Sequence, residues 1–124
     1  MIRIISLGDE PRPDELRIGA VQRAPRGLPR GAVYDLWMPE MAPSKELRRE
    51  FAHGAGFPMR EYLRRFKVEM GTLERKHLIR FVADLSRNVN FDIAVGCYCR
   101  DEDVCHRSVL RELLMKEGVE VGGR

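Results

Sequence analysis

The sequence has no hydrophobic run close to the roughly 18 to 20 residues that cross a bilayer. Its first residues also lack the basic start, apolar stretch and small-residue cleavage site of a signal peptide. We therefore expect a cytoplasmic protein that makes no membrane contact. The 124 residues show no repeat, no low-complexity tract and no interdomain linker, and 44% of them are hydrophobic, so we expect one domain over residues 1–124.

Aromatic residues and lysine are also scarce. Only 7% of the residues are aromatic, whereas nucleic-acid-binding surfaces usually combine a dense basic patch with interleaved aromatic rings. Nucleic-acid binding through the arginines is therefore an alternative that we do not favour. All but four of the 22 basic residues are arginine, and the guanidinium group binds phosphate and carboxylate in a bidentate manner. A small anionic ligand is a candidate partner, although the same arginines can also pair with the 19 acidic residues on the surface.

Cysteine is scarce as well. The chain has three cysteines, and this odd number argues against a framework of structural disulfides. All three lie within residues 97–106, together with one of the three histidines. Cysteines that cluster in a reducing compartment more often bind metal or perform chemistry than crosslink a fold. Residues 97–106 are therefore the candidate functional segment.

Stretches of strand and helix pattern alternate between glycine and proline breaks, which predicts an α/β fold: a single three-layer domain with a small, mainly parallel sheet flanked by helices. The strands are expected over residues 1–7, 16–21, 32–38, 91–98 and 119–121. The helices are expected from Ser44 to near Gly54, over residues 58–70, from Thr72 to beyond Leu85, and from Cys105 to about Glu117. Because residues 91–98 are apolar almost without a break, we expect their strand at the centre of the sheet.

The cysteines are expected to meet at one end of this sheet. Side chains two residues apart in a strand share a face, so Cys97 and Cys99 point the same way. Cys105 is expected at the opening of the last helix, with Asp103 as its N-cap. The unpaired N–H groups and the dipole of a helix N-terminus favour a thiolate, and they can lower a cysteine pKa from about 8.5 to about 3.5–7.5. This placement predicts an activated thiol at Cys105.

Four interpretations of the cluster stay open. In the first, which makes the protein a cysteine-dependent enzyme without an expected cofactor, Cys105 is the nucleophile, His106 carries a proton and Arg107 binds negative charge. In the second, zinc binds to Cys97, Cys99, Cys105 and His106, although the adjacent residues 105 and 106 must then both reach one ion. In the third, Cys99 and Cys105 form a reversible disulfide. In the fourth, these side chains only pack in the core.

Further candidate ligand-binding residues lie upstream. The loop over residues 22–31 carries Arg23 and Arg26, which can present cations to an anionic ligand. The ring of Trp37 can form the wall of a pocket. Together with Asp35 and Cys99, these residues form the expected binding site for a small anionic or nucleotide-like ligand.

Three stretches in this order resemble the bacterial and archaeal DUF488 family. They are Arg-Ala-Pro-Arg-Gly at residues 23–27, Tyr-Asp-Leu-Trp-Met-Pro-Glu-Met-Ala-Pro-Ser at residues 34–44, and Cys-Tyr-Cys leading to Cys-His-Arg-Ser at residues 97–108. The resemblance extends over nearly all of the chain. It implies a compact α/β domain whose Cys-His-Arg turn is the functional end, with the loop at residues 23–27 and the segment from Asp35 to Trp37 as neighbours. It implies no particular reaction.

Overall fold

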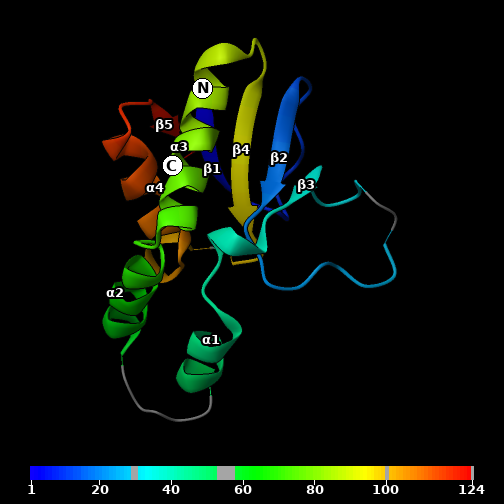
Figure 1. The fold of residues 1–124 in the computed structure, drawn as a ribbon. Coiled ribbons are helices and arrows are strands. Elements are labelled where there is room, and N and C mark those ends of the chain that lie inside the picture. The colour runs from blue at the N-terminus through cyan, green and yellow to red at the C-terminus, as the bar shows by residue number, and fades with distance from the viewer. Residues whose placement is uncertain (29–30, 53–57, 100, 124) are drawn as a thin grey trace.

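The computed structural model describes residues 1–28, 31–52, 58–99 and 101–123 (Figure 1). One five-stranded sheet has the order β3-β2-β4-β1-β5, and all its strand pairs are parallel. The strands are β1 (Ile2–Ser6), β2 (Glu15–Gly19), β3 (Leu36–Trp37), β4 (Asp92–Cys97) and β5 (Val121–Gly122). The helices are α1 (Lys45–Ala52), α2 (Met59–Glu69), α3 (Leu73–Asn88) and α4 (Arg107–Lys116), with short 3₁₀ turns η1 (Pro39–Met41) and η2 (Glu102–Val104). The structure confirms the α/β class and the central position of β4.

Side chains of all four α-helices share one hydrophobic core with one face of the sheet. Alternating strand residues such as Ile4, Ile18 and Val95 form one core cluster with side chains from every α-helix. The helices contribute Leu47 from α1, Phe66 from α2, Ile79, Val82 and Ala83 from α3, and Val109, Leu110 and Leu114 from α4. In α3 and α4 the contributing residues lie one, three or four positions apart, which is the spacing of an apolar helix face.

Loop side chains cover the opposite face. Val33 and Tyr34 pack there against a smaller core cluster. The Tyr34 ring lies so close to β2 that a Cβ atom at Gly19 would approach it within 2.4 Å, so the close contact requires glycine. This packing corrects the strand expected over residues 32–38: only Leu36–Trp37 pairs with β2, because the residues before it cover the sheet instead. In the described part of the chain, the third layer is this segment and not a helix.

Two predicted helix caps are present. Thr72 accepts a backbone hydrogen bond in the first turn of α3 (3.4 Å), and the Ser44 hydroxyl accepts one from Leu47 in the first turn of α1 (3.1 Å). Ser44 also donates to the Glu69 carboxylate at the end of α2, through its backbone N–H (2.9 Å) and its hydroxyl. The start of α1 is therefore fastened to the end of α2. The predicted end of the first helix near Gly54 lies outside the described residues.

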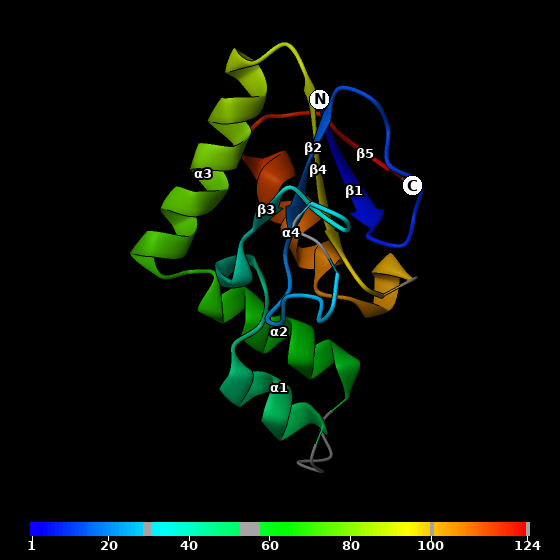
Figure 2. The ribbon, with the colours of Figure 1, turned by 90° about the vertical axis from the view of Figure 1, so that its right-hand side faces the viewer.

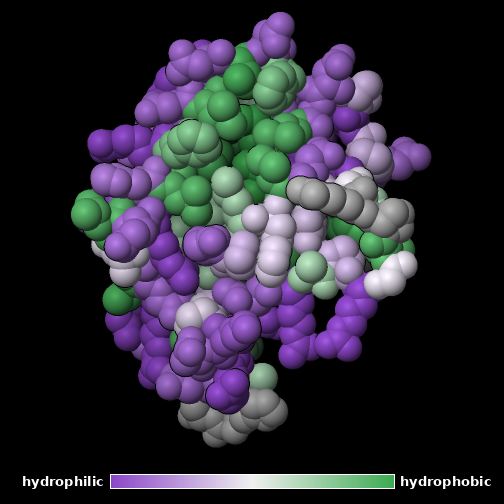
Figure 3. Space-filling model, turned by 45° about the vertical axis from the view of Figure 1, so that its right-hand side comes forward, coloured by the Kyte–Doolittle hydropathy of each residue, from purple (hydrophilic) through white to green (hydrophobic). Residues whose placement is uncertain are grey.

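Helices α1 and α2 lie beyond the carboxyl ends of the strands (Figures 1 and 2). Figure 3 shows mostly hydrophilic side chains around these two helices, whereas apolar side chains gather over α3 and the neighbouring strands. None of the helices described here is long and apolar enough to cross a membrane. Ligands of parallel α/β sheets bind beyond the carboxyl ends of the strands. A functional site is therefore expected at the end of the molecule that carries α1 and α2.

Candidate functional site

The three cysteines meet where β4 ends. Cys97 is the last residue of β4, Cys99 follows two positions later, and Cys105 comes directly after η2. The Sγ atoms of Cys97 and Cys105 are 2.9 Å apart, and all three Sγ atoms lie within 4.8 Å of one another. We call these residues the thiol cluster. Cys97 and Cys105 are buried, while Cys99 is exposed.

The chain reaches Cys105 through a turn that differs from the predicted one. Asp103 is not the N-cap of α4, because His106 holds that position without a side-chain cap. Asp101 instead caps η2, where its Oδ1 accepts a hydrogen bond from the Asp103 N–H (3.0 Å). Since η2 forms a helical turn of its own, α4 begins only at Arg107, and Cys105 lies two residues before that helix with an extended backbone. The sulfur still faces the start of α4, where the backbone N–H of Arg107 helps to lower the pKa of Cys105.

Cys105 carries the negative charge of the thiol cluster. The hydrogen bond with the Cys97 thiol is the main cause that lowers the pKa of Cys105, and burial opposes it. His106, whose Nδ1 lies 3.6 Å from the Cys105 sulfur, lowers this pKa further. The same hydrogen bond, together with burial, raises the pKa of Cys97. Burial, followed by the charge of Cys105, raises the pKa of Cys99. The protons therefore stay on Cys97 and Cys99.

The imidazole of His106 is held in one orientation. Its Nε2 lies 2.7 Å from the carbonyl oxygen of Ala20, directly after β2. Because a carbonyl oxygen can only accept, Nε2 carries a proton, and Nδ1 is the ring nitrogen that faces Cys105. The ring also makes an edge contact with Phe66, with the centroids 5.5 Å apart. His106 can therefore take a proton from Cys105 only at Nδ1.

Arg107 supports the thiol cluster from within the fold. Only 2% of this residue is exposed. Its guanidinium donates to the carbonyl oxygen of Cys99 (2.8 Å), and its Nε donates to the Cys105 sulfur (3.5 Å). The side chain thus joins the end of β4 to the thiolate and stabilises the charge there.

The thiol cluster opens into a cleft of about 390 Å³, which we call the thiol cleft. Its walls come from the end of β4, the chain after β2, the helices α1 and α2, and the turn before α4. The lining residues are Val21, Gln22, Arg23, Ala42, Pro43, Arg48, Phe51, Met59, Tyr62, Cys97, Tyr98, Cys99, Val104, Cys105 and His106. A volume of this order is typical of sites for small molecules.

Aromatic rings form one wall of the thiol cleft. Phe51 of α1 and Tyr62 of α2 are stacked, with ring centroids 4.4 Å apart and an interplanar angle of 19°. Burial raises the pKa of Tyr62 to about 12, with Arg48 opposing the shift, so the hydroxyl stays protonated at neutral pH. The Tyr98 hydroxyl donates to the carbonyl oxygen of Arg23 (3.2 Å) and thereby ties the arginine loop to the end of β4.

Of the other residues that the sequence predicted for the site, one lines the thiol cleft and the others lie outside it. Arg23 lines the thiol cleft, whereas the exposed Arg26 is not among its lining residues. Asp35 accepts a backbone hydrogen bond from β2 (2.8 Å), and the Trp37 Nε1 donates to the carbonyl oxygen of Val21 (2.7 Å). Val21 lines the thiol cleft and Trp37 does not, so Trp37 holds a lining residue in place without contacting a ligand in the cleft.

Sequence reasoning missed Arg48, Phe51 and Tyr62 as residues of the site. Helical spacing assigns Phe51 and Tyr62 to apolar helix faces and places Arg48 outside, facing solvent. That spacing shows which face of each helix is buried. It does not show that the two faces meet over the thiols, since this depends on how the chain crosses the end of the sheet.

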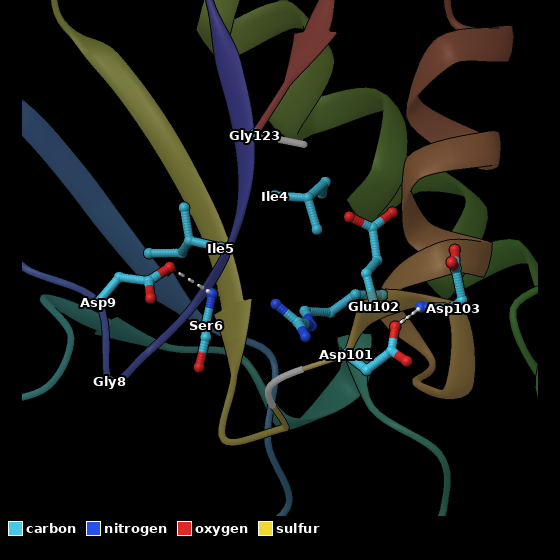
Figure 4. Close-up of a pocket in the computed structure, with 10 residues that line it drawn as sticks. Ile4, Ile5, Ser6, Gly8, Asp9, Asp101, Glu102, Asp103 and Gly123 are labelled. Atoms are coloured by element: carbon cyan, nitrogen blue, oxygen red, sulfur yellow. Dashed lines mark hydrogen bonds between the residues drawn. The ribbon is translucent and has the colours of Figure 1, made fainter.

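Arg107 also lines a second cavity of about 680 Å³, shown in Figure 4. The surrounding carboxylates are engaged within the fold: Asp9 and Asp101 accept backbone hydrogen bonds (3.1 and 3.0 Å), and Glu102 pairs with Arg111 (2.6 Å). No thiol is found among the described residues that line it. Although this cavity is larger, the described cysteines and His106 line the thiol cleft.

Comparisons with known proteins place this arrangement in a family context. The family model DUF488-N3a, described as the active DUF488-N3 subclade, matches residues 2–118 and so includes the whole thiol cluster. No curated protein and no solved structure matches the chain.

Proposed function

Because the chain belongs to the DUF488 family and its thiol cluster opens into a cleft, we propose that it binds and acts on a small anionic or nucleotide-like ligand, with Cys105 as nucleophile. The contacts of Cys105 carry this proposal. Its sulfur lies beside the Cys97 thiol, the His106 imidazole and the Arg107 guanidinium, and it also lines the cleft. A buried thiolate that a ligand can reach is the group that nucleophilic catalysis requires.

The groups around Cys105 supply a complete proton path. His106 takes the thiol proton at Nδ1, and the Ala20 carbonyl stabilises the imidazolium that forms. The sulfur then bonds to an electrophilic atom of the ligand, and the bond from that atom to its leaving group breaks. The leaving group departs with the electron pair and receives the proton from Nδ1. Arg107 positions the sulfur throughout.

Alkylation of the full chain by iodoacetamide tests this proposal. At pH 6–7 we expect Cys105 to react at least about tenfold faster than free cysteine, because a cysteine of ordinary pKa is almost entirely protonated there. The C105S variant should lose this fast reaction and the C99S variant should keep it. If Cys105 reacts no faster than free cysteine, the proposal that Cys105 is a nucleophile is contradicted.

The closeness of the three sulfurs favours a second candidate, a zinc site without catalysis. Cys97, Cys99 and Cys105 form a group of candidate ligands, whereas His106 is not part of it. Zinc–sulfur bonds of about 2.3 Å in a tetrahedral site separate the sulfurs by roughly 3.8 Å. The 2.9 Å between Cys97 and Cys105 is shorter, so these sulfurs would have to move apart.

Elemental analysis distinguishes the two candidates. The nucleophile predicts purified protein with far less than one zinc per chain and a fold that survives chelation. A structural zinc would contribute on the order of 10 to 16 kcal/mol in apparent terms, as much as the whole stability of a typical domain. Stoichiometric zinc whose removal unfolds the chain would therefore replace the nucleophile with a structural site.

A further inference from the structure

A second hollow adjoins the thiol cleft. It measures about 620 Å³ and is lined by residues of α1, α2 and the chain after β2. Four of its lining residues are cations, namely Arg23, Lys45, Arg48 and Arg49, and we call it the basic recess. Arg23 and Arg48 line the thiol cleft too, so the two hollows are adjacent and share wall residues.

Among the residues that the structure describes, the cations of the basic recess lack the carboxylate partners that other arginines of the protein have. Seven arginines form ion pairs with carboxylates: Arg3, Arg17, Arg64, Arg65, Arg80, Arg87 and Arg111. In the described ranges, none of the four recess cations has such a partner, and no acidic residue lines the recess. Like charges gathered without compensation repel one another, and a bound anion relieves that repulsion. This group of cations therefore favours an anionic group at this end.

The wall between the two hollows is aromatic. The stacked rings of Phe51 and Tyr62 line both the thiol cleft and the basic recess. A flat, apolar ring system can pack beside them in the cleft, close to Cys105, while a charged tail extends over Arg48 into the recess. Figure 3 shows the molecular end around α1 as largely hydrophilic, as expected for a surface that holds a solvated anion.

We propose that the basic recess binds the diphosphate or triphosphate of a nucleotide whose base and sugar lie in the thiol cleft. The placement of the base and sugar rests on the proposed function of the thiol cleft. The placement of the phosphates rests on the basic recess alone. Arginine guanidinium groups bind phosphate oxygens in a bidentate manner, and three of the four cations are arginines. A chain of two or three phosphates offers several oxygens and charges, so it can pair with more than one of these cations.

Calorimetric titration of the full-length C105S chain tests the recess without the nucleophile. The probes are inorganic pyrophosphate, the nucleoside diphosphates ADP, GDP, CDP and UDP, and adenosine. We expect pyrophosphate to bind, at least one nucleoside diphosphate to bind about tenfold more tightly, and adenosine to bind more weakly than either. Added salt should weaken pyrophosphate binding, because the Debye length shortens from about 10 Å at 0.1 M to about 3 Å at 1 M.

A matched pair of charge reversals locates the binding. The R48E substitution should weaken pyrophosphate binding at least tenfold, whereas R12E, which reverses an exposed arginine in the connection between β1 and β2, should change it less than twofold. Equal losses in both variants would show attraction to net charge alone and overturn the recess. If a single-stranded oligonucleotide binds more tightly than every nucleoside diphosphate, the proposal of a nucleotide ligand is overturned in favour of nucleic-acid binding.

These outcomes are separate from those of the alkylation test. Pyrophosphate binding that R48E abolishes supports the recess even when Cys105 proves unreactive, since the titration uses protein without that thiol. Conversely, a reactive Cys105 in a chain that does not bind pyrophosphate would overturn the recess and leave the nucleophile in place.

Discussion

Cys97 and Cys105 are the same kind of side chain in unequal surroundings. Cys105 has three groups that stabilise its anion, whereas Cys97 donates to that anion and is otherwise buried. The negative charge therefore concentrates on the sulfur that also touches His106 and Arg107. At this scale, function depends on which of two neighbouring atoms holds a single proton.

The contribution of His106 can be measured with a substitution that removes only Nδ1. The amide nitrogen of glutamine lies near the position of Nε2, so H106Q can keep the hydrogen bond to the Ala20 carbonyl and lose the contact with Cys105. We expect the pKa of Cys105 to rise by about one unit, which corresponds to about 1.4 kcal/mol, so that the midpoint of the pH profile of alkylation moves to higher pH. The exposed His77 of α3 provides the control H77Q, which should leave the rate unchanged. An H106Q protein with the wild-type pH profile would exclude His106 as the proton carrier.

At the scale of elements, the sequence predicted features that depend on a few neighbouring residues, such as helix caps. Ser44 and Thr72 cap helices as expected, because a cap depends on the few residues that follow it. The cap at Asp103 was wrong because η2 competes for the same acidic residues, and Asp101 begins that turn. The long strand expected over residues 32–38 was wrong because Tyr34 packs on the sheet instead of pairing at its edge. The first error is a local choice between two neighbouring acidic residues, whereas the second comes from a contact with β2 that residues 32–38 alone do not contain.

The tie between α1 and α2 gives a prediction at this scale. Both helices carry walls of the thiol cleft, and the Glu69 carboxylate joins them through Ser44. We expect E69A to lower the free energy of unfolding by about 1.5 to 3 kcal/mol, the usual range for hydrogen bonds to a charged group, as measured by urea titration. The exposed Glu120, whose side chain has no ion pair in the part of the chain that the structure describes, provides the control E120A. Equal stability of E69A and wild type would show that packing alone holds the helices together.

At the scale of the whole molecule, the site is a product of topology. The sequence predicted that Cys97, Cys99 and Cys105 would lie close together, as they do, although β4 ends at Cys97 and Cys99 lies beyond the strand. It did not predict that Arg48 and Tyr62, more than thirty positions earlier, would line the same cleft. The central position of β4 brings its carboxyl end toward α1 and α2, and only the assembled sheet has that geometry.

The central claim is that the charge of the cluster lies on the buried Cys105 and not on the exposed Cys99. The pKa of Cys105 is lowered and that of Cys99 is raised, so acidification should protonate Cys99 first. The thiolate fraction of a cysteine falls about tenfold for each pH unit below its pKa. Between pH 8 and pH 6, the Cys99 rate should therefore fall about a hundredfold, while the Cys105 rate changes little.

The most direct measurement is a competition within one molecule. The full chain is treated with a limiting amount of iodoacetamide at pH 6 and at pH 8, and peptide mass spectrometry quantifies the label on each cysteine. We predict that Cys105 is labelled before Cys99 at pH 6, although only 3% of Cys105 is exposed, and that the ratio of Cys105 to Cys99 label falls as the pH rises. Label on Cys99 before Cys105 at pH 6 would contradict the account.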